Sequence, residues 1–327
     1  MIRMSLKKIA QMVGTTPSTV SRVLNNAYQS CASQELKDKI WAAAQELNYI
    51  PNSNARNLKK GSQVSEEMIH ISVLFTRLDT SKPDPFFLEL SRHIKSDLFA
   101  NHCILDQIGK ADAAAIAKSA SSDGILLLGR CSETLLAKLK AVNRNLVGIW
   151  RNPTNFDIDE VVCDGKKAAL LAMEHLIHLG HTNIGYIGDC SYESRYVGYC
   201  DALISHNLPI NYPLIIPTHQ TEAEGYDGMH KLLQQPLATA VLCANDATAI
   251  GALRALKEQK KRTLSVISID NIEEAQSTNP LLTTVNIPRE DMAHMAIYIL
   301  LDRIHKKHTE HIRIEFPCRI VQRDSCY

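Results

Sequence analysis

The hydrophobic pattern at the start of the chain predicts two short helices separated by a tight turn. Apolar side chains at positions 6, 9, 10 and 13 recur at helical spacing and would share one face. Gly14 fits the turn, because glycine adopts positive φ without steric cost. Thr16 suits the N-cap of a second helix, and Pro17 suits its first position, where no backbone donor is needed.

The second helix combines an apolar face with a polar one. Its apolar positions are 20, 23 and 24, which leaves short hydroxyls and one arginine pointing outward. Such side chains suit contacts with base edges and phosphates, so the pair is typical of a helix-turn-helix that enters the major groove of DNA. The candidate contacts are Thr16, Pro17, Ser18, Thr19, Ser21 and Arg22. The alternative is an ordinary helical hairpin on a globular domain.

A third helix is predicted over residues 33–47, with an apolar inner face and a stop at residues 48–51. The segment that follows, residues 52–61, is too polar to form a core by itself. It is either a linker or a helix that folds only against DNA and a partner chain.

From Ile69 onward the hydrophobic period changes to that of strands alternating with helices. This order predicts parallel sheets with helices on both faces, over a length that exceeds one ordinary doubly wound domain. Two subdomains are therefore expected, with ligands at the carboxyl ends of the strands. The expected strands are 69–75, 124–128, 146–150, 159–163, 184–187, 214–216, 240–243 and 264–269. The expected helices are 86–98, 134–141, 166–179, 196–205, 225–233 and 246–258.

Charge is distributed unevenly over the 327 residues, whose formal net charge is +1. Residues 1–61 contain nine Lys and Arg against three acidic residues, which gives +6. The remaining 27 basic and 32 acidic residues give −5. A basic head on an acidic body is expected for a polyanion-binding module joined to another domain.

Composition and motifs narrow the functional class. The nine cysteines are scattered and form no CxxC pair, which is typical of small core residues in a reducing cytoplasm. No apolar run has the length of a membrane span, and the first residues lack the pattern of a signal peptide. A phosphate loop, GxSxG and HExxH are all absent, so we expect no enzyme and no cofactor. Histidines at 175, 178 and 181, and at 305, 308 and 311, drift around a helix, so no metal site is expected.

Several segments share the motifs of one family. In the head these are TVSRVLN (19–25), LNYIPN (47–52) and ARNL (55–58). In the body they include DGI (123–125), LGH (179–181), ND (245–246) and PLLTTV (280–285). In this order they make the chain similar, over essentially its whole length, to the LacI/GalR family of transcription regulators.

The resemblance implies a helix-turn-helix DNA-binding domain over 1–51, a hinge helix and linker over 52–63, and an effector-binding and dimerisation domain over 64–327. In the hinge helix of the family, a leucine from each subunit wedges into the minor groove, and Leu58 occupies that position here. The alternative is a linker leucine that packs on the body. The further DNA contacts that the resemblance implies are Asn25, Tyr49, Asn52, Ala55, Arg56 and Leu58.

For the body, the resemblance implies a periplasmic-binding-protein-like fold, with parallel sheets in two subdomains and an effector held between them. Arg195, Asn245 and Asp270 match effector-binding positions, and their forked or paired polar groups suit a polyhydroxy ligand. The alternatives are a strand-end cap for Asp270 and a helix N-cap for Asn245. The implied effector contacts are Phe87, Trp150, Ser191, Arg195, Gln220, Asn245 and Asp270.

The chain departs from the family pattern at several positions. Pro17 stands where members commonly have a longer base-reading side chain. Trp150, followed by Arg151, stands where members often have an aspartate, so its indole either stacks on a sugar ring or belongs to the core. Gln220 replaces a stacking aromatic. The short stretch 104–122 predicts that a helix and a strand are trimmed, and this, with Ser268 in place of glycine, is similar to the branch that controls galactosidase operons.

The resemblance implies an allosteric repressor of a carbohydrate-utilisation operon, working in the cytoplasm and released by a sugar, with a galactoside as the particular guess. It binds a near-palindromic operator as a homodimer. The chain ends at Tyr327 without a heptad tail, which favours a dimer over a tetramer. One alternative is a regulator that responds to a purine or another non-sugar ligand. The other is a sugar-binding receptor without a DNA role, which would need a signal peptide and no basic head.

Overall fold

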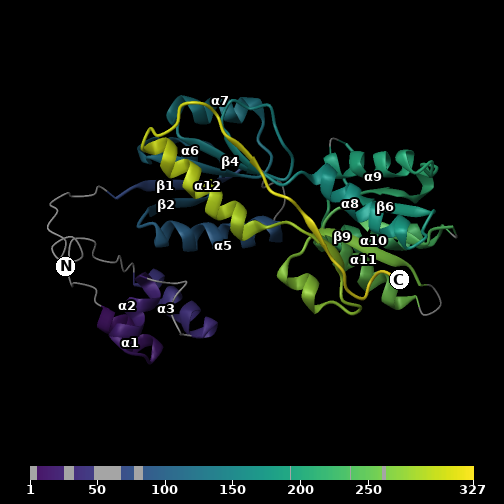
Figure 1. Ribbon diagram of the computed structural model, residues 1–327, viewed down its shortest axis with the longest axis horizontal. Coiled ribbons are helices and arrows are strands. Elements are labelled where there is room, and N and C mark those ends of the chain that lie inside the picture. Colours follow the sequence, from purple (N-terminus) through teal and green to yellow (C-terminus); the bar gives the residue numbers. More distant parts are fainter. Residues whose placement is uncertain are drawn as a thin grey trace. The chain divides into compact units, whose positions relative to one another are not determined.

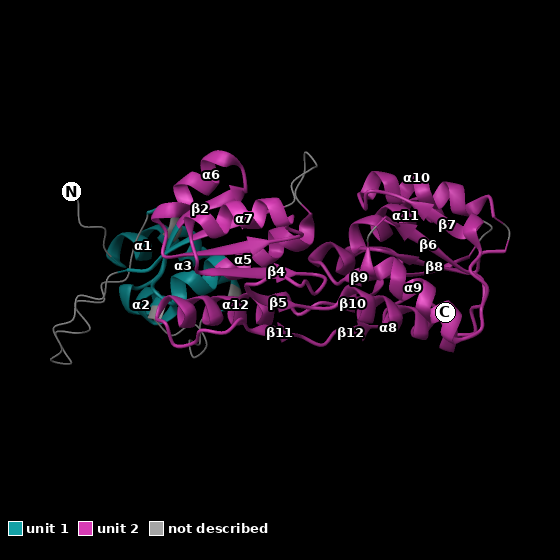
Figure 2. Cartoon of the chain, turned by 90° about the horizontal axis from the view of Figure 1, so that it is seen from above, with its two compact units in different colours: residues 1–71, 95–105 teal, residues 72–94, 106–327 magenta. Residues whose placement is uncertain are grey.

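The computed structural model describes residues 6–25, 33–47, 68–76, 84–191, 193–235, 237–259 and 263–327. Contacts divide the chain into two compact units, residues 1–71 with 95–105 and residues 72–94 with 106–327 (Figure 2). The predicted linker, residues 52–63, lies outside the described residues.

The described residues of the head form three helices, drawn in purple in Figure 1: α1 (Leu6–Val13), α2 (Pro17–Asn25) and α3 (Gln34–Glu46). Gly14 takes a φ of 71° in the turn between α1 and α2, as its position predicts. Each helix contributes fully buried aliphatic side chains to one core, among them Ile9, Val20 and Ile40. The helix-turn-helix predicted from the hydrophobic pattern is therefore confirmed.

The first sheet of the body has the strand order β11-β5-β4-β3-β1-β2. Its strands are β1 (His70–Phe75), β2 (Ile104–Lys110), β3 (Gly124–Leu128), β4 (Leu146–Trp150), β5 (Asp159–Val162) and β11 (Arg313–Glu315). β3, β4, β5 and β11 pair in parallel. The accompanying helices are α5 (Pro85–Ala100), α6 (Ala113–Lys118), α7 (Glu133–Val142) and α12 (Arg289–Ile304), with a short 3-10 turn η2 (Ser119–Ser121). We call these elements the first subdomain.

The second sheet has the order β12-β10-β9-β8-β6-β7. Within its described strands, β12 pairs with β10 in antiparallel orientation, and the other neighbouring strands pair in parallel. Its strands are β6 (Ile184–Gly188), β7 (Ile215–Pro217), β8 (Ala240–Cys243), β9 (Ser265–Asp270), β10 (Thr283–Asn286) and β12 (Arg319–Val321). Its helices are α8 (Gly165–His178), α9 (Ser194–Ser205), α10 (Glu222–Leu233) and α11 (Asp246–Glu258), with 3-10 turns η3 (Tyr212–Leu214) and η4 (Glu273–Ser277). We call these elements the second subdomain.

Within the described body, the chain passes between the two subdomains three times. The connections join β5 to α8, β10 to α12, and β11 to β12 (Figure 1). The predicted α/β class, with parallel sheets in two subdomains, is confirmed. The expectation of a trimmed strand between 104 and 122 is wrong, because β2 has seven residues there, although helix α6 has only six.

Candidate functional site

The outer face of α2 carries the hydroxyls and the arginine that the sequence predicts. Thr16, Ser18 and Arg22 are exposed, and Thr19 is half-buried. The Thr16 hydroxyl accepts the backbone N–H of Thr19 at 3.2 Å, which satisfies a donor at the start of the helix. The Arg22 Nε lies 3.5 Å from the Ser18 carbonyl oxygen. The face is therefore polar, positively charged and accessible.

Only some of the other predicted DNA contacts of the head lie within the described residues. Pro17 is exposed at the first position of α2, and Ser21 is half-buried on the same helix. Asn25 ends α2, and its side chain lies outside the described residues. The remaining predicted contacts also lie outside the described residues and stay predictions: Tyr49, Asn52, Ala55, Arg56 and Leu58.

In the body, Arg195 is held almost entirely by protein partners. It lies in the first turn of α9 and is 2% exposed. Its guanidinium donates to both Glu193 carboxylate oxygens, at 2.9 and 3.0 Å, and to the Ala244 carbonyl at 2.6 Å. A fourth hydrogen bond, of 2.8 Å, reaches the Gln220 side-chain oxygen. Burial raises the pKa of the Glu193 carboxyl, but the charge and hydrogen bonds of Arg195 outweigh this effect and lower the pKa to about 2.

Gln220 and Asn245 complete this network at the carboxyl ends of β7 and β8. The Asn245 amide nitrogen donates to the Gln220 carbonyl at 3.1 Å. The Asn245 side-chain oxygen accepts from the Thr248 backbone N–H at 2.9 Å and from the Thr248 hydroxyl at 2.6 Å. Asn245 is therefore the N-cap of α11, the structural alternative that the sequence left open.

Asp270 ends β9 with a φ of 125° and is 2% exposed. Its Oδ2 accepts from Arg151 at 2.9 Å, whereas its buried Oδ1 has no hydrogen-bond partner among the described residues. Burial raises the pKa of Asp270 to about 7 against the opposing charge of Arg151. The carboxyl group thus has one buried oxygen without a hydrogen-bond partner among the described residues, and its pKa is near neutral.

Arg151, at the end of β4, connects the two subdomains. It donates to both oxygens of Asp84 in the first subdomain, at 2.8 and 3.1 Å, and to Asp270 in the second. Its guanidinium carbon lies 4.3 Å from the Phe86 ring centroid and 5.0 Å from that of Phe87. The sequence analysis named Arg151 only as the residue after Trp150 and did not predict that it contacts a ligand. Its position after a buried strand was the available signal, whereas nothing marked Asp84 as its partner.

Two other predicted effector contacts have different surroundings. Trp150 is 2% exposed and packs in the core of the first subdomain, edge to face with Phe156 at 6.5 Å between centroids. Its indole also covers Gly148, where an added Cβ would lie 1.9 Å from the ring. In this conformation Trp150 presents no surface to a ligand. Ser191 is exposed, and its hydroxyl donates to Asp189 at 2.6 Å.

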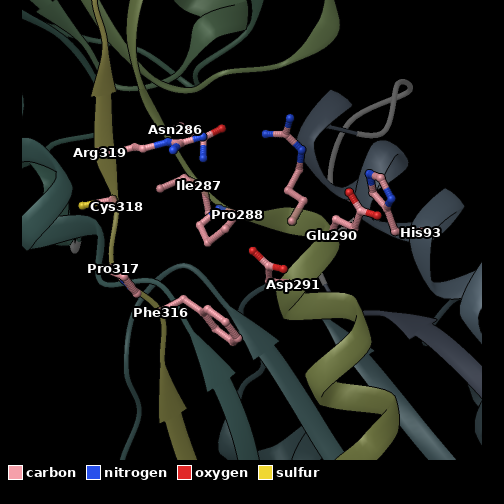
Figure 3. A pocket seen from close by; sticks show the side chains of 11 residues that line it. His93, Asn286, Ile287, Pro288, Glu290, Asp291, Phe316, Pro317, Cys318 and Arg319 are labelled. Atoms are coloured by element: carbon pink, nitrogen blue, oxygen red, sulfur yellow. The ribbon is translucent and has the colours of Figure 1, made fainter. Parts of the chain in front are cut away.

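A separate cavity of about 500 Å³ lies beside the connections between the subdomains (Figure 3). Residues 286–291 and 316–319 form most of its lining, together with His93. None of the predicted effector contacts lines it.

The arrangement at the strand ends is suited to binding polar molecules. We call Asp84, Arg151, Arg195, Gln220, Asn245 and Asp270 the strand-end cluster. The network around Arg195 and the bridge between Arg151 and Asp270 influence each other electrostatically, because the positive charge of Arg195 counteracts the rise in the pKa of Asp270. Among the described residues, no group of three or more His, Cys, Asp or Glu side chains could hold a metal ion. No helix of the described chain is long and apolar enough to cross a membrane.

Comparisons with known proteins agree with this architecture. The model of bacterial regulatory proteins of the lacI family matches residues 5–52, and that of the periplasmic binding protein-like domain matches residues 173–326. The HTH-type transcriptional repressor PurR of Photorhabdus laumondii is 31% identical, over 98% of this chain and 96% of that protein.

Solved structures show the same fold. The CelR–cellobiose complex is 24% identical with a TM-score of 0.70, over 99% of this chain and 100% of that one. A LacI family regulator from Enterococcus faecium with bound ribose is 26% identical with a TM-score of 0.70, over 79% of this chain and 98% of that one.

A basic helix-turn-helix joined to a two-subdomain body defines a DNA-binding regulator with a ligand-responsive domain. The chain belongs to the lacI family of bacterial regulatory proteins, and it is a ligand-responsive transcriptional repressor.

Proposed function

We propose that this repressor acts as a homodimer in the cytoplasm, binds a near-palindromic operator, and is released by a small polyhydroxylated effector at the strand-end cluster. Two-fold symmetry of the protein would match two-fold symmetry of the operator. The related regulator from Enterococcus faecium, with its bound ribose, supports a sugar as the effector class. We propose binding functions alone, without catalysis, which agrees with the regulatory relatives.

The observation that carries the effector proposal is a group of buried polar atoms without partners in the described chain. Asp270 Oδ1 and Asn152 Oδ1 are acceptors, and Arg151 Nε is a donor. Arg151 pairs with Asp270 through its terminal nitrogen, and Asn152 is the next residue in the chain. Unpaired buried polar groups cost free energy. A sugar hydroxyl both donates and accepts, so one ligand with several hydroxyls would satisfy all three atoms.

The Arg151 bridge supplies a mechanism for the response. It holds Asp84 of the first subdomain and Asp270 of the second at the same time. An effector hydroxyl that binds Asp270 competes with Arg151 and changes how the two subdomains are held together. Because coupling between sites is reciprocal, an effector that weakens operator binding itself binds less tightly to the DNA complex.

For DNA, we propose that the face of α2 defined by Thr16, Ser18 and Arg22 enters the major groove. Residues 1–51 form the DNA-binding domain, residues 52–63 the hinge, and residues 64–327 the effector-binding and dimerisation domain. The wedge at Leu58 inserts into the minor groove of the operator.

The test is a thermal-shift screen of the full chain against mono- and disaccharides, galactosides included, together with purine bases. A saccharide is expected to raise the melting temperature of the wild-type protein, since it binds the native state alone. Asp270→Asn should abolish this shift, whereas the control Asp157→Asn, an exposed carboxylate bound to Lys140 and His311, should preserve it. A shift caused only by purines would contradict the proposal, as would a saccharide shift that survives Asp270→Asn.

A further inference from the structure

One short segment of the second subdomain, residues 270–273, is held by side chains of the first subdomain. It begins at Asp270, whose carboxylate is bound by Arg151. The backbone of the segment is held separately, by Arg289 at the start of α12 and by Glu89 on α5. The proposed effector site uses Asp270 but neither of these last two side chains.

Arg289 binds two successive carbonyl groups of this segment. Its guanidinium donates to the Asp270 carbonyl and, at 2.8 Å, to the Asn271 carbonyl. The same guanidinium pairs with Glu89 at 3.0 Å, and the two side chains are only 11% and 8% exposed. A planar guanidinium with several fixed donors makes these contacts together, whereas a lysine ammonium, which is a point charge, does not reproduce that geometry.

Glu89 binds the other end of the segment. One of its carboxylate oxygens pairs with Arg289, and the other accepts the Glu273 backbone N–H at 2.9 Å. Glu273 begins the 3-10 turn η4, whose N-cap residue, Ile272, has no side-chain acceptor. The donor at the start of that turn is therefore satisfied from the other subdomain. Glu89 and Arg289 together hold three backbone groups of residues 270–273, and we call the two side chains the backbone clamp.

The clamped segment has a backbone conformation that depends on such contacts. Asp270 has a φ of 125° and Asn271 a φ of 54°, so two successive residues other than glycine lie in the left-handed region. This region is unfavourable for residues with a Cβ, and they stay in it where the surrounding structure holds them. The same backbone sets the direction in which the Asp270 carboxylate leaves the end of β9.

We propose that Glu89 and Arg289 are positioning residues of the effector site, which orient the Asp270 carboxylate by holding the backbone behind it against the first subdomain. This inference rests on the proposed role of Asp270 in binding the effector. Because the backbone clamp joins the two subdomains, their relative arrangement and the orientation of Asp270 change together. A ligand that moves the carboxylate therefore also loosens the carbonyls that Arg289 holds.

The first measurement needs no ligand. Hydrogen–deuterium exchange of the full chain, followed by peptide mapping, reports how well the backbone amides of residues 271–273 are protected. We expect Arg289→Lys to speed their exchange about tenfold, the effect of one lost charge-assisted hydrogen bond. The matched control is Arg92→Lys, because Arg92 also reaches Glu273 from α5, but through side chains that are 66% and 74% exposed. This variant should exchange as the wild-type protein does.

The second measurement titrates ribose and galactose into each protein by calorimetry. Arg289→Lys should raise the Kd of the sugar that the wild-type protein binds by about tenfold, for the same reason. Glu89→Gln keeps an acceptor for the Glu273 N–H but removes the charge opposite Arg289, so its effect should be smaller. A pair with only a structural role would lower the melting temperature and leave the sugar Kd of the folded protein unchanged.

These two measurements separate the possible failures. Unchanged amide exchange in Arg289→Lys would overturn the backbone clamp, and faster exchange with an unchanged sugar Kd would overturn its positioning role. Equal effects in Arg92→Lys would also contradict the proposal, since any contact between α5 and η4 would then suffice. A wild-type protein that binds neither sugar, yet shows the difference in exchange, would contradict the proposed effector class and support the clamp.

Discussion

Two arginines at the strand ends of the body, Arg195 and Arg151, are both buried but are held in different ways. Arg195 makes four hydrogen bonds, all to partners within the second subdomain. Arg151 makes three, which are shared between Asp84 in one subdomain and Asp270 in the other. Its Nε and the Asp270 Oδ1 are left unpaired in the described structure.

This difference separates a structural group from a responsive one. The partners of Arg195 all belong to the second subdomain, so a movement of one subdomain against the other need not break its hydrogen bonds. The partners of Arg151 come from both subdomains, and any such movement changes its hydrogen bonds. A ligand can bias only an element that differs between two states, so we propose that the effector acts on the Arg151 side of the strand-end cluster.

The largest expected effect comes from Arg195→Ala. The substitution leaves the Glu193 carboxylate buried without its counter-charge, and breaking one side of a buried pair costs about 3–5 kcal/mol of unfolding free energy. Chemical denaturation monitored by circular dichroism measures the loss. Glu193→Gln with Arg195→Met, which removes both charges, should recover much of it. A loss below about 1 kcal/mol for Arg195→Ala alone would contradict the structural role.

Arg195 also illustrates how far the sequence predicts this site. The resemblance to the family implied Arg195, Gln220, Asn245 and Asp270 as effector contacts, whereas the alternation of strands and helices predicted only that ligands bind at strand ends. Their partners were not predicted, because Glu193 and Ala244 join Arg195 only through the folded arrangement of three segments. At Arg195, Gln220 and Asn245 the sequence therefore suggested ligand contacts where the structure shows hydrogen bonds within the protein, whereas Asp270 keeps one unpaired oxygen.

The same limit applies to the fold. The eight expected strands are present within one or two residues, because each contains apolar residues in a short run, even where polar residues accompany them, as in β5 (DEVV). One strand that was not predicted, β2, has seven residues but a mixed apolar and polar sequence, ILDQIGK. The others are short: β10 reads TTVN, and β11 and β12 have three residues each. These segments become strands through pairing with β9, β5 and β10, which no local pattern reports.

An intermediate effect is expected on the pH dependence of stability. The pKa of the Asp270 carboxyl is 3.8 in the unfolded chain and about 7 in the folded protein. Between these two pH values the folded state binds more protons than the unfolded chain does. The stability that protonation of Asp270 contributes is therefore fully present below about pH 4 and is lost as the pH rises to about 7. One such group contributes a slope of up to about 1.4 kcal/mol per pH unit.

Asp270→Asn removes this contribution, and denaturation at several pH values between 4 and 8 measures the change in slope. Asp246, whose pKa burial raises to about 6, adds a slope of the same sign that the variant should retain. If the slope of Asp270→Asn equals that of the wild-type protein, Asp246 causes the pH dependence. The prediction that the pKa of Asp270 is raised would then be wrong.

The smallest expected effect on stability comes from Arg151→Met, which keeps an apolar side chain against Phe86 and Phe87 but removes the bridge. We expect a loss of about 1–2 kcal/mol, because Asp84 is partly exposed and Asp270 can take up a proton. Small-angle scattering should show a larger radius of gyration as the subdomains separate. The matched control is Arg92→Met, since the Arg92–Glu273 pair also joins the subdomains but is 66% and 74% exposed. An equal expansion in Arg92→Met would mean that any ion pair between the subdomains has this effect, and it would contradict a particular role for the buried Arg151 bridge.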